Sequence, residues 1–273
     1  MQPSELPTGE QQVDEDAQGL PFPVVREVGL LAPFEWLAKG AADLASHPGA
    51  SIFYGVCFAF MGLLLSTVFS HAYHLTSGLV CGFLLLGPFV SLGLYDLSRQ
   101  REAGRPTVLA HSLTAGQHNA GAIGVFAVVL IIIFLVWARA SLVVFALFYT
   151  SEMPSMARFV EQIVGLENIE FLMAYAFVGF IFASLVFGAS VVAIPLMLDR
   201  RQDAVTSMLA SLIALGHNPG PMLIWALLIV LLTVAGFTTF FLGLIVLMPL
   251  IGHATWHAYR ALVEPLPERP EPD

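Results

Sequence analysis

Long apolar runs separated by short polar segments make up most of the chain. A helix crosses a bilayer with roughly 20 apolar residues, and six runs reach or approach that length. They are residues 49–70, 76–95, 120–138 (or 120–149 if the helix continues), 169–198, 219–236 and 238–258. The last two are divided near Gly236 because 219–258 holds about two spans of minimum length, although the uncharged run 222–252 also fits one long helix. The pattern predicts an all-α, polytopic membrane protein with about six transmembrane helices.

A short amphipathic segment precedes every second apolar run. Residues 203–217 carry apolar side chains near one helical face, which is typical of a helix lying in the membrane interface. These side chains are Val205, Met208, Leu209, Leu212 and Leu215. Residues 33–50 and 104–117 show the same pattern. We therefore expect a membrane domain over 33–263, built from three pseudo-repeats of one interfacial helix plus one helical hairpin. The units cover residues 33–98, 104–202 and 203–260.

Similar motifs end the three short segments. They read His-Pro-Gly at 47–49, His-Asn-Ala-Gly at 118–121 and His-Asn-Pro-Gly at 217–220. Asn is a favoured helix N-cap, Pro is favoured at the first helical position, and His is tolerated at the negative end of the preceding helix. The motifs predict structural corners between a flat helix and an upright one. The corner residues are His47, Pro48, His118, Asn119, His217, Asn218 and Pro219.

A proline recurs in the second helix of each unit, at Pro88, Pro195 and Pro249. Proline bends a helix and frees a backbone carbonyl, which must then find another neighbour. Three such helices predict a packed bundle that is kinked at equivalent positions.

The composition agrees with a membrane protein. Of the 273 residues, 57% are hydrophobic and 11% are charged, whereas about a quarter are charged in a soluble domain. Much of the acidic charge lies at the two ends of the chain. We expect residues 1–32 to form an acidic, disordered tail and residues 264–273 an acidic, Pro-rich tail. Neither tail favours binding to nucleic acid.

Basic residues set the expected orientation. Arg99, Arg101 and Arg105 follow the second apolar run, and Arg200 and Arg201 follow the fourth. Because basic loops stay on the cytoplasmic side, both termini are predicted to be cytoplasmic.

The middle unit carries an apolar surplus on its outer side. Arg139 lies 20 residues after Asn119, which is about 30 Å along a helix, so it should reach the far interface. The segment 140–168 then projects beyond the bilayer or folds back over the bundle. It is a candidate surface for a membrane-protein partner, besides the lipid bilayer itself, or a lid.

Candidate chemistry is sparse. The stretches 51–95, 120–138, 171–198 and 222–252 contain no Asp, Glu, Lys or Arg, which disfavours an ion-coupled transporter. No nucleophile or nucleotide motif occurs, so we predict no catalytic residues, no cofactor and no enzymatic activity. His253 and His257 stand at i, i+4 and are the candidate metal ligands; the alternative is two interfacial histidines bonded to carbonyls and headgroups. Cys57 and Cys81 lie inside apolar runs and are expected to be buried thiols.

Three stretches resemble a bacterial family of predicted integral membrane proteins, known as domain of unknown function 2189. They are LGPFVSLGLYDLSRQREAG (86–104), VVAIPLMLDRRQDAVTSMLASLIALGHNPGPMLIWA (191–226) and FFLGLIVLMPLIGHATWHAYRALVE (240–264). The resemblance covers about residues 33–263 and implies a polytopic protein without an established activity. Some members are labelled cytochrome c oxidase subunit I-like, but this chain lacks the intrahelical histidines that such catalysis needs.

These observations favour a non-enzymatic accessory, scaffold or assembly protein, compatible with a place beside a respiratory complex. Two alternatives stay open. The first is a transporter or channel for a small solute or a lipid. The second is a metal or haem binder on the cytoplasmic side.

Overall fold

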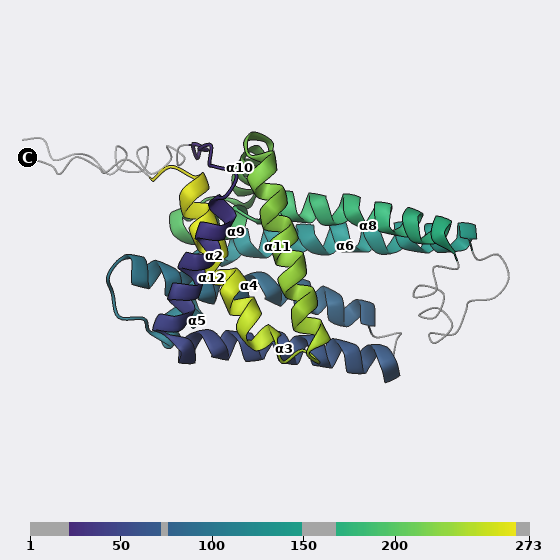
Figure 1. Cartoon of the computed structure of the whole chain (residues 1–273), viewed down its shortest axis with the longest axis horizontal. Helices are drawn as coiled ribbons and strands as arrows, with labels where there is room; N and C mark the ends of the chain where they lie inside the picture. The colour runs from purple at the N-terminus through teal and green to yellow at the C-terminus, as the bar shows by residue number, and fades with distance from the viewer. Residues whose placement is uncertain (1–21, 72–75, 149–167, 266–273) are drawn as a thin grey trace, which may run out of the picture.

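The described part of the chain folds almost entirely into helices (Figure 1). The structure, a computed structural model, describes residues 22–71, 76–148 and 168–265. Within these residues the only extended pairing is one isolated antiparallel bridge between Val25 and Val263. The all-α prediction is therefore confirmed.

The helices follow the predicted order of a short helix before each long pair. They are α2 (Ala32–Ser46), α3 (Pro48–His71), α4 (Thr76–Glu102), α5 (Leu109–Thr114), the 3₁₀ helix η2 (Ala115–Asn119), α6 (Ala120–Phe148), α8 (Ile169–Ser190), α9 (Ala193–Arg200), α10 (Ala204–His217), α11 (Pro219–Thr238) and α12 (Leu244–Leu262). The uncharged run 222–252 is divided by turns at 239–243, so it forms two helices. The third predicted run takes its longer form and continues to Phe148.

Four segments of the described chain are long and apolar enough to cross a membrane. They are Pro48–Val68, Leu109–Phe148, Ile169–Arg200 and Pro219–Thr238. The remaining two predicted spans lie in α4 and α12, which are not among these four. The polytopic prediction holds, whereas six crossings in three equivalent units are not confirmed.

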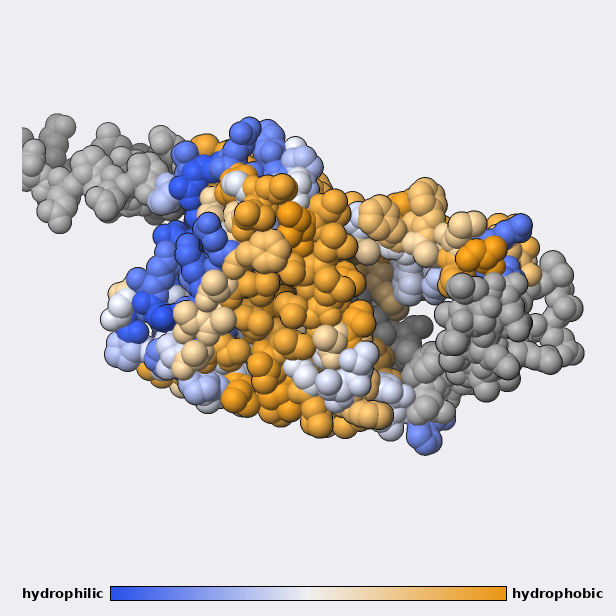
Figure 2. All heavy atoms as spheres, in the orientation of Figure 1, coloured by the Kyte–Doolittle hydropathy of each residue, from blue (hydrophilic) through white to orange (hydrophobic). Residues whose placement is uncertain are grey.

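The long helices form three pairs, α3 with α4, α6 with α8 and α11 with α12, and the three pairs do not all run in the same direction. In Figure 1, α3 and α4 extend from the core in the same direction as α6 and α8, whereas α11 and α12 are inclined to both pairs. Figure 2 shows hydrophilic residues gathered over the end of the molecule that holds α2 and the end of α12, while hydrophobic residues cover α11. One end of the molecule is therefore polar, and the long helices lead away from it.

The core lies where the second helices of the three pairs meet. Leu92 of α4, Leu196 and Met197 of α9, and Trp256 and Tyr259 of α12 are all at most 1% exposed. All five belong to one contiguous cluster. Large apolar side chains of this kind supply most of the stabilisation of such a core. The core therefore joins all three pairs at the polar end.

The N-terminal segment packs onto the end of α12. The backbone N–H of Arg26 donates to the carbonyl of Leu262 at 2.7 Å, and that of Glu264 donates to the carbonyl of Val24 at 2.9 Å. The predicted tail boundary at residue 32 is therefore too late, because residues before it already contact the core. The rest of both predicted tails, residues 1–21 and 266–273, lies outside the described residues.

The structure describes the surroundings of two of the three prolines. The fourth predicted run is interrupted at Val191 and Val192, and Pro195 begins the next turn in α9. This is where the proline ring would clash with the carbonyl four residues earlier. Pro249 lies inside α12, and its side chain is buried there. Pro88 lies within α4, but its side chain is outside the described part of the chain.

Candidate functional sites

A buried chain of polar side chains joins four helices at the polar end. Ser51 of α3 contacts Nε2 of His253 at 2.9 Å, and Nδ1 of His253 contacts Ser98 of α4 at 2.8 Å. The Ser98 hydroxyl donates to Oδ2 of Asp43 in α2 at 2.6 Å. Because Ser98 gives its one proton to Asp43, Nδ1 of His253 is the donor in its contact with Ser98. His253 is thereby held between α3 and α4.

Asp43 is the anionic centre of this network and is only 5% exposed. Its carboxylate also accepts from Nε2 of His257 at 2.9 Å and pairs with Arg101. Burial alone would raise the pKa of Asp43, but the hydrogen bonds from His257 and Ser98, with the charges beside it, lower that pKa below its ordinary value of 3.8. The carboxylate is therefore stabilised in its charged form.

The two candidate metal ligands do not converge on one open position. Both ring nitrogens of His253 are occupied by serine hydroxyls, and Nε2 of His257 is occupied by Asp43. Among the described residues, no group of three or more His, Cys, Asp or Glu side chains is placed to hold a metal ion. The geometry instead makes these histidines links between α12 and its neighbours.

The same contacts argue against a serine nucleophile. Ser51 is fully buried, and its hydroxyl also lies 3.1 Å from the carbonyl of His47. A nucleophile needs access to its substrate, which Ser51 does not have. The role that fits Ser51, Ser98 and His253 is to fix α3, α4 and α12 in register.

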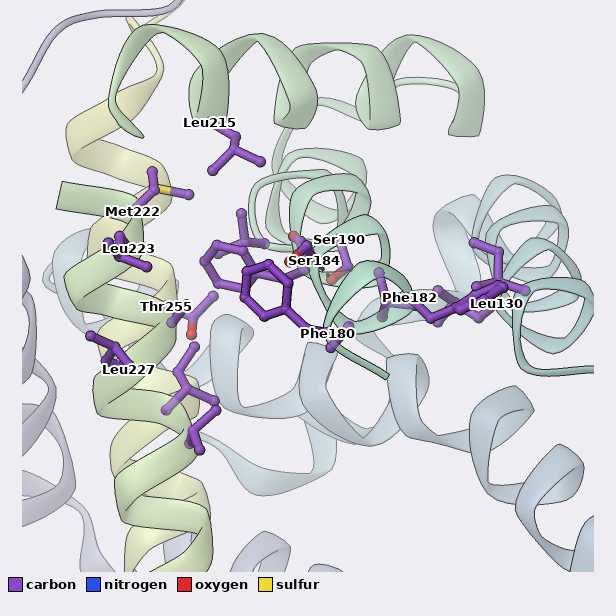
Figure 3. A pocket seen from close by; sticks show the side chains of 18 of the residues that line it. Leu130, Phe180, Phe182, Ser184, Ser190, Leu215, Met222, Leu223, Leu227 and Thr255 are labelled. Carbon is purple, nitrogen blue, oxygen red and sulfur yellow. Dashed lines mark hydrogen bonds between the residues drawn. The ribbon is translucent and has the colours of Figure 1, made fainter. Parts of the chain in front are cut away.

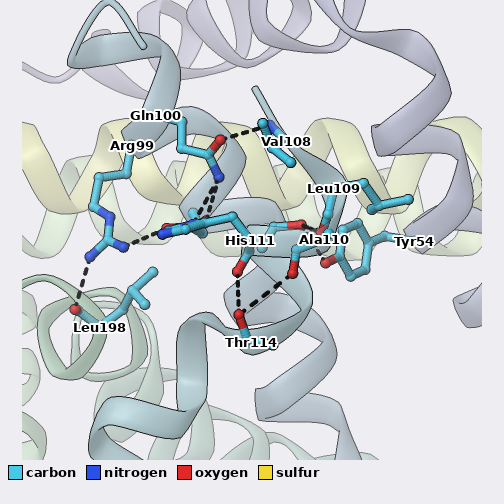
Figure 4. Close-up of polar contacts among 11 residues, drawn as sticks. Tyr54, Arg99, Gln100, Val108, Leu109, Ala110, His111, Thr114 and Leu198 are labelled. Atoms are coloured by element: carbon cyan, nitrogen blue, oxygen red, sulfur yellow. Dashed lines mark hydrogen bonds and ion pairs between the residues drawn. The ribbon is translucent and has the colours of Figure 1, made fainter. Parts of the chain in front are cut away.

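A second polar cluster surrounds Asp96, which is fully buried. Figure 4 shows its members Arg99, Gln100 and His111. Arg99 donates to its Oδ1 at 2.5 Å, and Gln100 and His111 contact its Oδ2 at 2.6 and 2.7 Å. Arg99 also donates to the carbonyl of Leu198 at 3.2 Å. The cluster thus ties the end of α4 to α5 and α9, so it too is placed for structure.

The predicted corners exist, but their asparagines act differently from the prediction. His47 separates α2 from α3, and Pro219 opens α11 directly after His217 and Asn218. Asn218 makes no capping hydrogen bond with its side chain. Its Oδ1 instead accepts from the N–H of Val28 at 2.8 Å, and its Nδ2 donates to the carbonyl of Arg26 at 3.0 Å.

Asn119 is also a link between segments. Its Nδ2 donates to the carbonyls of Met197 and Gln202, at 3.1 and 2.8 Å. Both asparagines therefore bond to backbone groups of a distant segment, and for Asn218 the predicted side-chain cap is not formed. The three corner histidines lie on separate connections, and His118 and His217 are exposed.

Sequence reasoning missed Asp43, although a signal was present. The buried face of α2 consists of Pro33, Trp36, Gly40 and Asp43, which recur at helical spacing. A single acid on an apolar helical stripe indicates a buried partner. Cys57, predicted to be buried, is only partly buried, and the side chain of Cys81 is outside the described residues.

An apolar crevice of about 1280 Å³ opens between the α6–α8 hairpin and α11 (Figure 3). Leu130 of α6, Phe180 of α8 and Leu227 of α11 form its walls, Leu215 of α10 lies at one end, and Thr255 of α12 lies deep inside. The crevice is open to the surroundings of the protein, and its lining is mainly apolar. Water is a poor environment for such a lining, so the crevice favours contact with apolar material.

Two hydroxyl groups of the crevice are directed at their own helices. Thr255 donates to the carbonyl of Ile251 at 2.7 Å, and Ser190 donates to that of Phe187 at 3.5 Å. These hydroxyls are therefore already satisfied and give a polar solute little to bind.

Helical hairpins with apolar outer faces, joined at one polar end, define an integral membrane protein. Residues 75–199 match a protein family described as a predicted integral membrane protein, DUF2189, which confirms the resemblance seen in the sequence. The matched segment contains 86–104, but it ends before 240–264 and most of 191–226. The cytochrome c oxidase-like label is not confirmed. No curated protein and no solved structure matches the chain.

Proposed function

We propose that this protein is a non-enzymatic accessory or scaffold protein of the bacterial inner membrane. In this role it holds a partner membrane protein against the distal hairpin, defined as residues 140–148 of α6 and 169–178 of α8. An assembly factor beside a respiratory complex would be one form of this role.

The length of α6 carries the proposal. Its 29 residues extend about 43 Å at 1.5 Å per residue, whereas the hydrocarbon core of a bilayer is about 30 Å thick. With the Asn119 corner at one interface, about nine residues of α6 lie beyond the other interface. That surplus is apolar, so water is a poor environment for it.

The two helices of the distal hairpin pack against each other and still expose apolar side chains. Phe171 of α8 packs edge-on against Phe145 and Phe148 of α6, with ring centroids 5.6 and 5.8 Å apart. Leu147 is nevertheless 71% exposed and Phe177 is 65% exposed. Patches of this kind outside the bilayer mark protein interaction sites.

The experiment is site-specific photo-crosslinking in native membranes. A benzophenone amino acid replaces Leu147 in the distal hairpin and, as the control, Leu231 of α11, which is 64% exposed but lies in a candidate span. We expect one defined polypeptide adduct at Leu147 that is absent at Leu231. The substitution Phe177→Glu should abolish that adduct while the protein stays folded.

Two results would contradict this role. One is the same set of adducts at both positions, which would indicate random collision in the membrane. The other is an adduct with lipid alone at Leu147, which would place the distal hairpin inside the bilayer.

The contacts at the polar end support six crossings with both termini on one side. Asp43 before α3 is bonded to Ser98 near the end of α4, and Asn119 before α6 is bonded to Met197 in α9. Arg26 is bonded to Asn218 before α11 and to the carbonyl of Arg260 near the end of α12. Each pair thus returns to the level at which it began, as a membrane hairpin does.

A further inference from the structure

We propose that the crevice between the α6–α8 hairpin and α11 is a binding site for the acyl chains of one phospholipid, separate from the partner surface on the distal hairpin. Three of the four candidate spans supply its walls, namely the segments Leu109–Phe148, Ile169–Arg200 and Pro219–Thr238. The crevice is therefore at membrane depth, where acyl chains are the apolar material at hand.

The walls continue the surface that already faces lipid. Phe180 on α8 is 65% exposed, and Leu223 and Leu227 on α11 are also exposed. These side chains line the mouth of the crevice in Figure 3. An acyl chain can enter sideways from the bilayer without crossing a polar barrier.

The lining of the crevice suits acyl chains. It is an open groove whose walls are mainly apolar side chains of three helices, and flexible apolar chains can follow such a lining. A second transmembrane helix is the alternative occupant, and the retention experiment below distinguishes the two.

A glycine in the wall of the crevice leaves room for a larger side chain. A side chain added at Gly179 of α8, which lines the crevice, would meet no atom within 4 Å. Gly124 of α6 has the same open surroundings but does not line the crevice. These two glycines provide a variant that fills the site and a matched control that does not.

The experiment measures lipid retention by native mass spectrometry. The full chain is reconstituted in vesicles of phosphatidylethanolamine and phosphatidylglycerol, extracted in mild detergent and washed. We expect the unmodified protein and Gly124→Leu to retain one phospholipid. Gly179→Leu combined with Ala183→Phe should reduce the retained fraction at least tenfold, while circular dichroism and the melting temperature show that the protein is folded.

A photoactivatable phospholipid with a diazirine in its acyl chain locates the site. Adducts on peptides of α8 and α11 that survive the detergent wash support the proposal. Equal lipid retention by the crevice-filling variant, or no retained lipid in the unmodified protein, would overturn it. Retention of a second copy or of a peptide in place of lipid would overturn it as well. None of these outcomes depends on the partner adduct at Leu147, so the two proposals fail separately.

Discussion

At the scale of single residues, charged and polar side chains join the helices by hydrogen bonds and ion pairs at the polar end. Asp43 is an example, because one buried carboxylate accepts from Ser98 and His257 and pairs with Arg101. Removing one partner of a buried pair leaves the others uncompensated. We expect Asp43→Asn to lower the free energy of unfolding by about 2 kcal/mol, since Arg101 is partly exposed and solvent screens it.

The pH dependence of this effect has a defined sign. Burial raises the pKa of Asp43, but the hydrogen bonds to His257 and Ser98 outweigh it together with the nearby charges. Asp43 therefore has a lowered pKa in the folded protein. Its contribution to stability is therefore present above its ordinary value of 3.8 and is lost as the pH falls through the lower folded value. The measurement is the melting temperature in detergent between about pH 3 and pH 7, which includes the usual pKa range of Asp. Towards acid pH, the melting temperature of Asp43→Asn should fall less steeply than that of the unmodified protein.

The control for this series is Glu35→Gln, which removes an exposed acid from the same helix. We expect it to leave the acid limb of the profile unchanged. A profile for Asp43→Asn that parallels that of the unmodified protein would refute the assignment.

Asn218 gives a second prediction at this scale. Its amide accepts from Val28 and donates to Arg26, so the two ends of the side chain can be tested separately. Asn218→Asp keeps an acceptor for Val28 but loses the donor, whereas Asn218→Leu loses both. We expect cleavage after Arg26 in limited proteolysis to accelerate with Asn218→Asp and further with Asn218→Leu. If the asparagine acted as an N-cap instead, Asn218→Asp would be neutral, because Asp caps as well as Asn.

At the scale of helices, close packing depends on glycine. A methyl group at Gly55 of α3 would lie 1.9 Å from the carbonyl oxygen of Ile245 in α12. That carbonyl is four residues before Pro249 and so lacks its usual partner in the helix. The backbone of α3 at Gly55 is thus the neighbour of the freed group, and the contact leaves no room for a side chain.

Gly55→Ala should therefore destabilise the protein even though alanine favours helix. We expect a loss of about 1–3 kcal/mol, the usual range for overpacking, measured as a lower melting temperature in detergent. Gly49→Ala, on the same helix, meets no atom within 4 Å and should be neutral or stabilising by up to about 1 kcal/mol. Equal effects of the two substitutions would show that α3 does not pack on α12 at this point.

The elements could be predicted from the sequence because their signals are local. Apolar runs, the His-Pro and His-Asn corners and Pro195 each act within a few residues, and the helices begin and end near them. The polar network could not be predicted in the same way. Asp43 meets Ser98 and His257 across 55 and 214 residues of chain, and no short-range pattern encodes such pairs. The capping role predicted for Asn218 failed for the same reason, since its partners are distant backbone groups.

At the scale of the whole molecule, three helix pairs share one polar end and the third pair is inclined to the others. A helix that crosses a bilayer is tilted from the membrane normal by up to about 40°, so inclined helices can share one bilayer. The angle between α11 and the α6–α8 hairpin is also what opens the crevice. Topology and lipid binding are therefore linked, because aligning α11 with the other spans would narrow the space that the lipid occupies.

The membrane side on which two connections lie distinguishes six crossings from four. If α4 and α12 cross together with the four candidate spans, the connection after α4 lies on the side of the termini and the turn after α11 lies opposite. If α4 and α12 do not cross, both connections exchange sides. Ala103 lies in the connection after α4, Leu242 lies in the turn after α11, and both are exposed.

We expect Leu242→Cys to react with a membrane-impermeant maleimide on intact spheroplasts, and Ala103→Cys to react only after the membrane is permeabilised. The background carries Cys57→Ser and Cys81→Ser, so that each variant has a single thiol. The physical reason is the bond between Asp43 and Ser98, which requires the end of α4 to return to the level of α2. Labelling of Ala103→Cys on intact spheroplasts would mean that α3 crosses alone, and the bonded polar end could not then exist in the membrane as it does here.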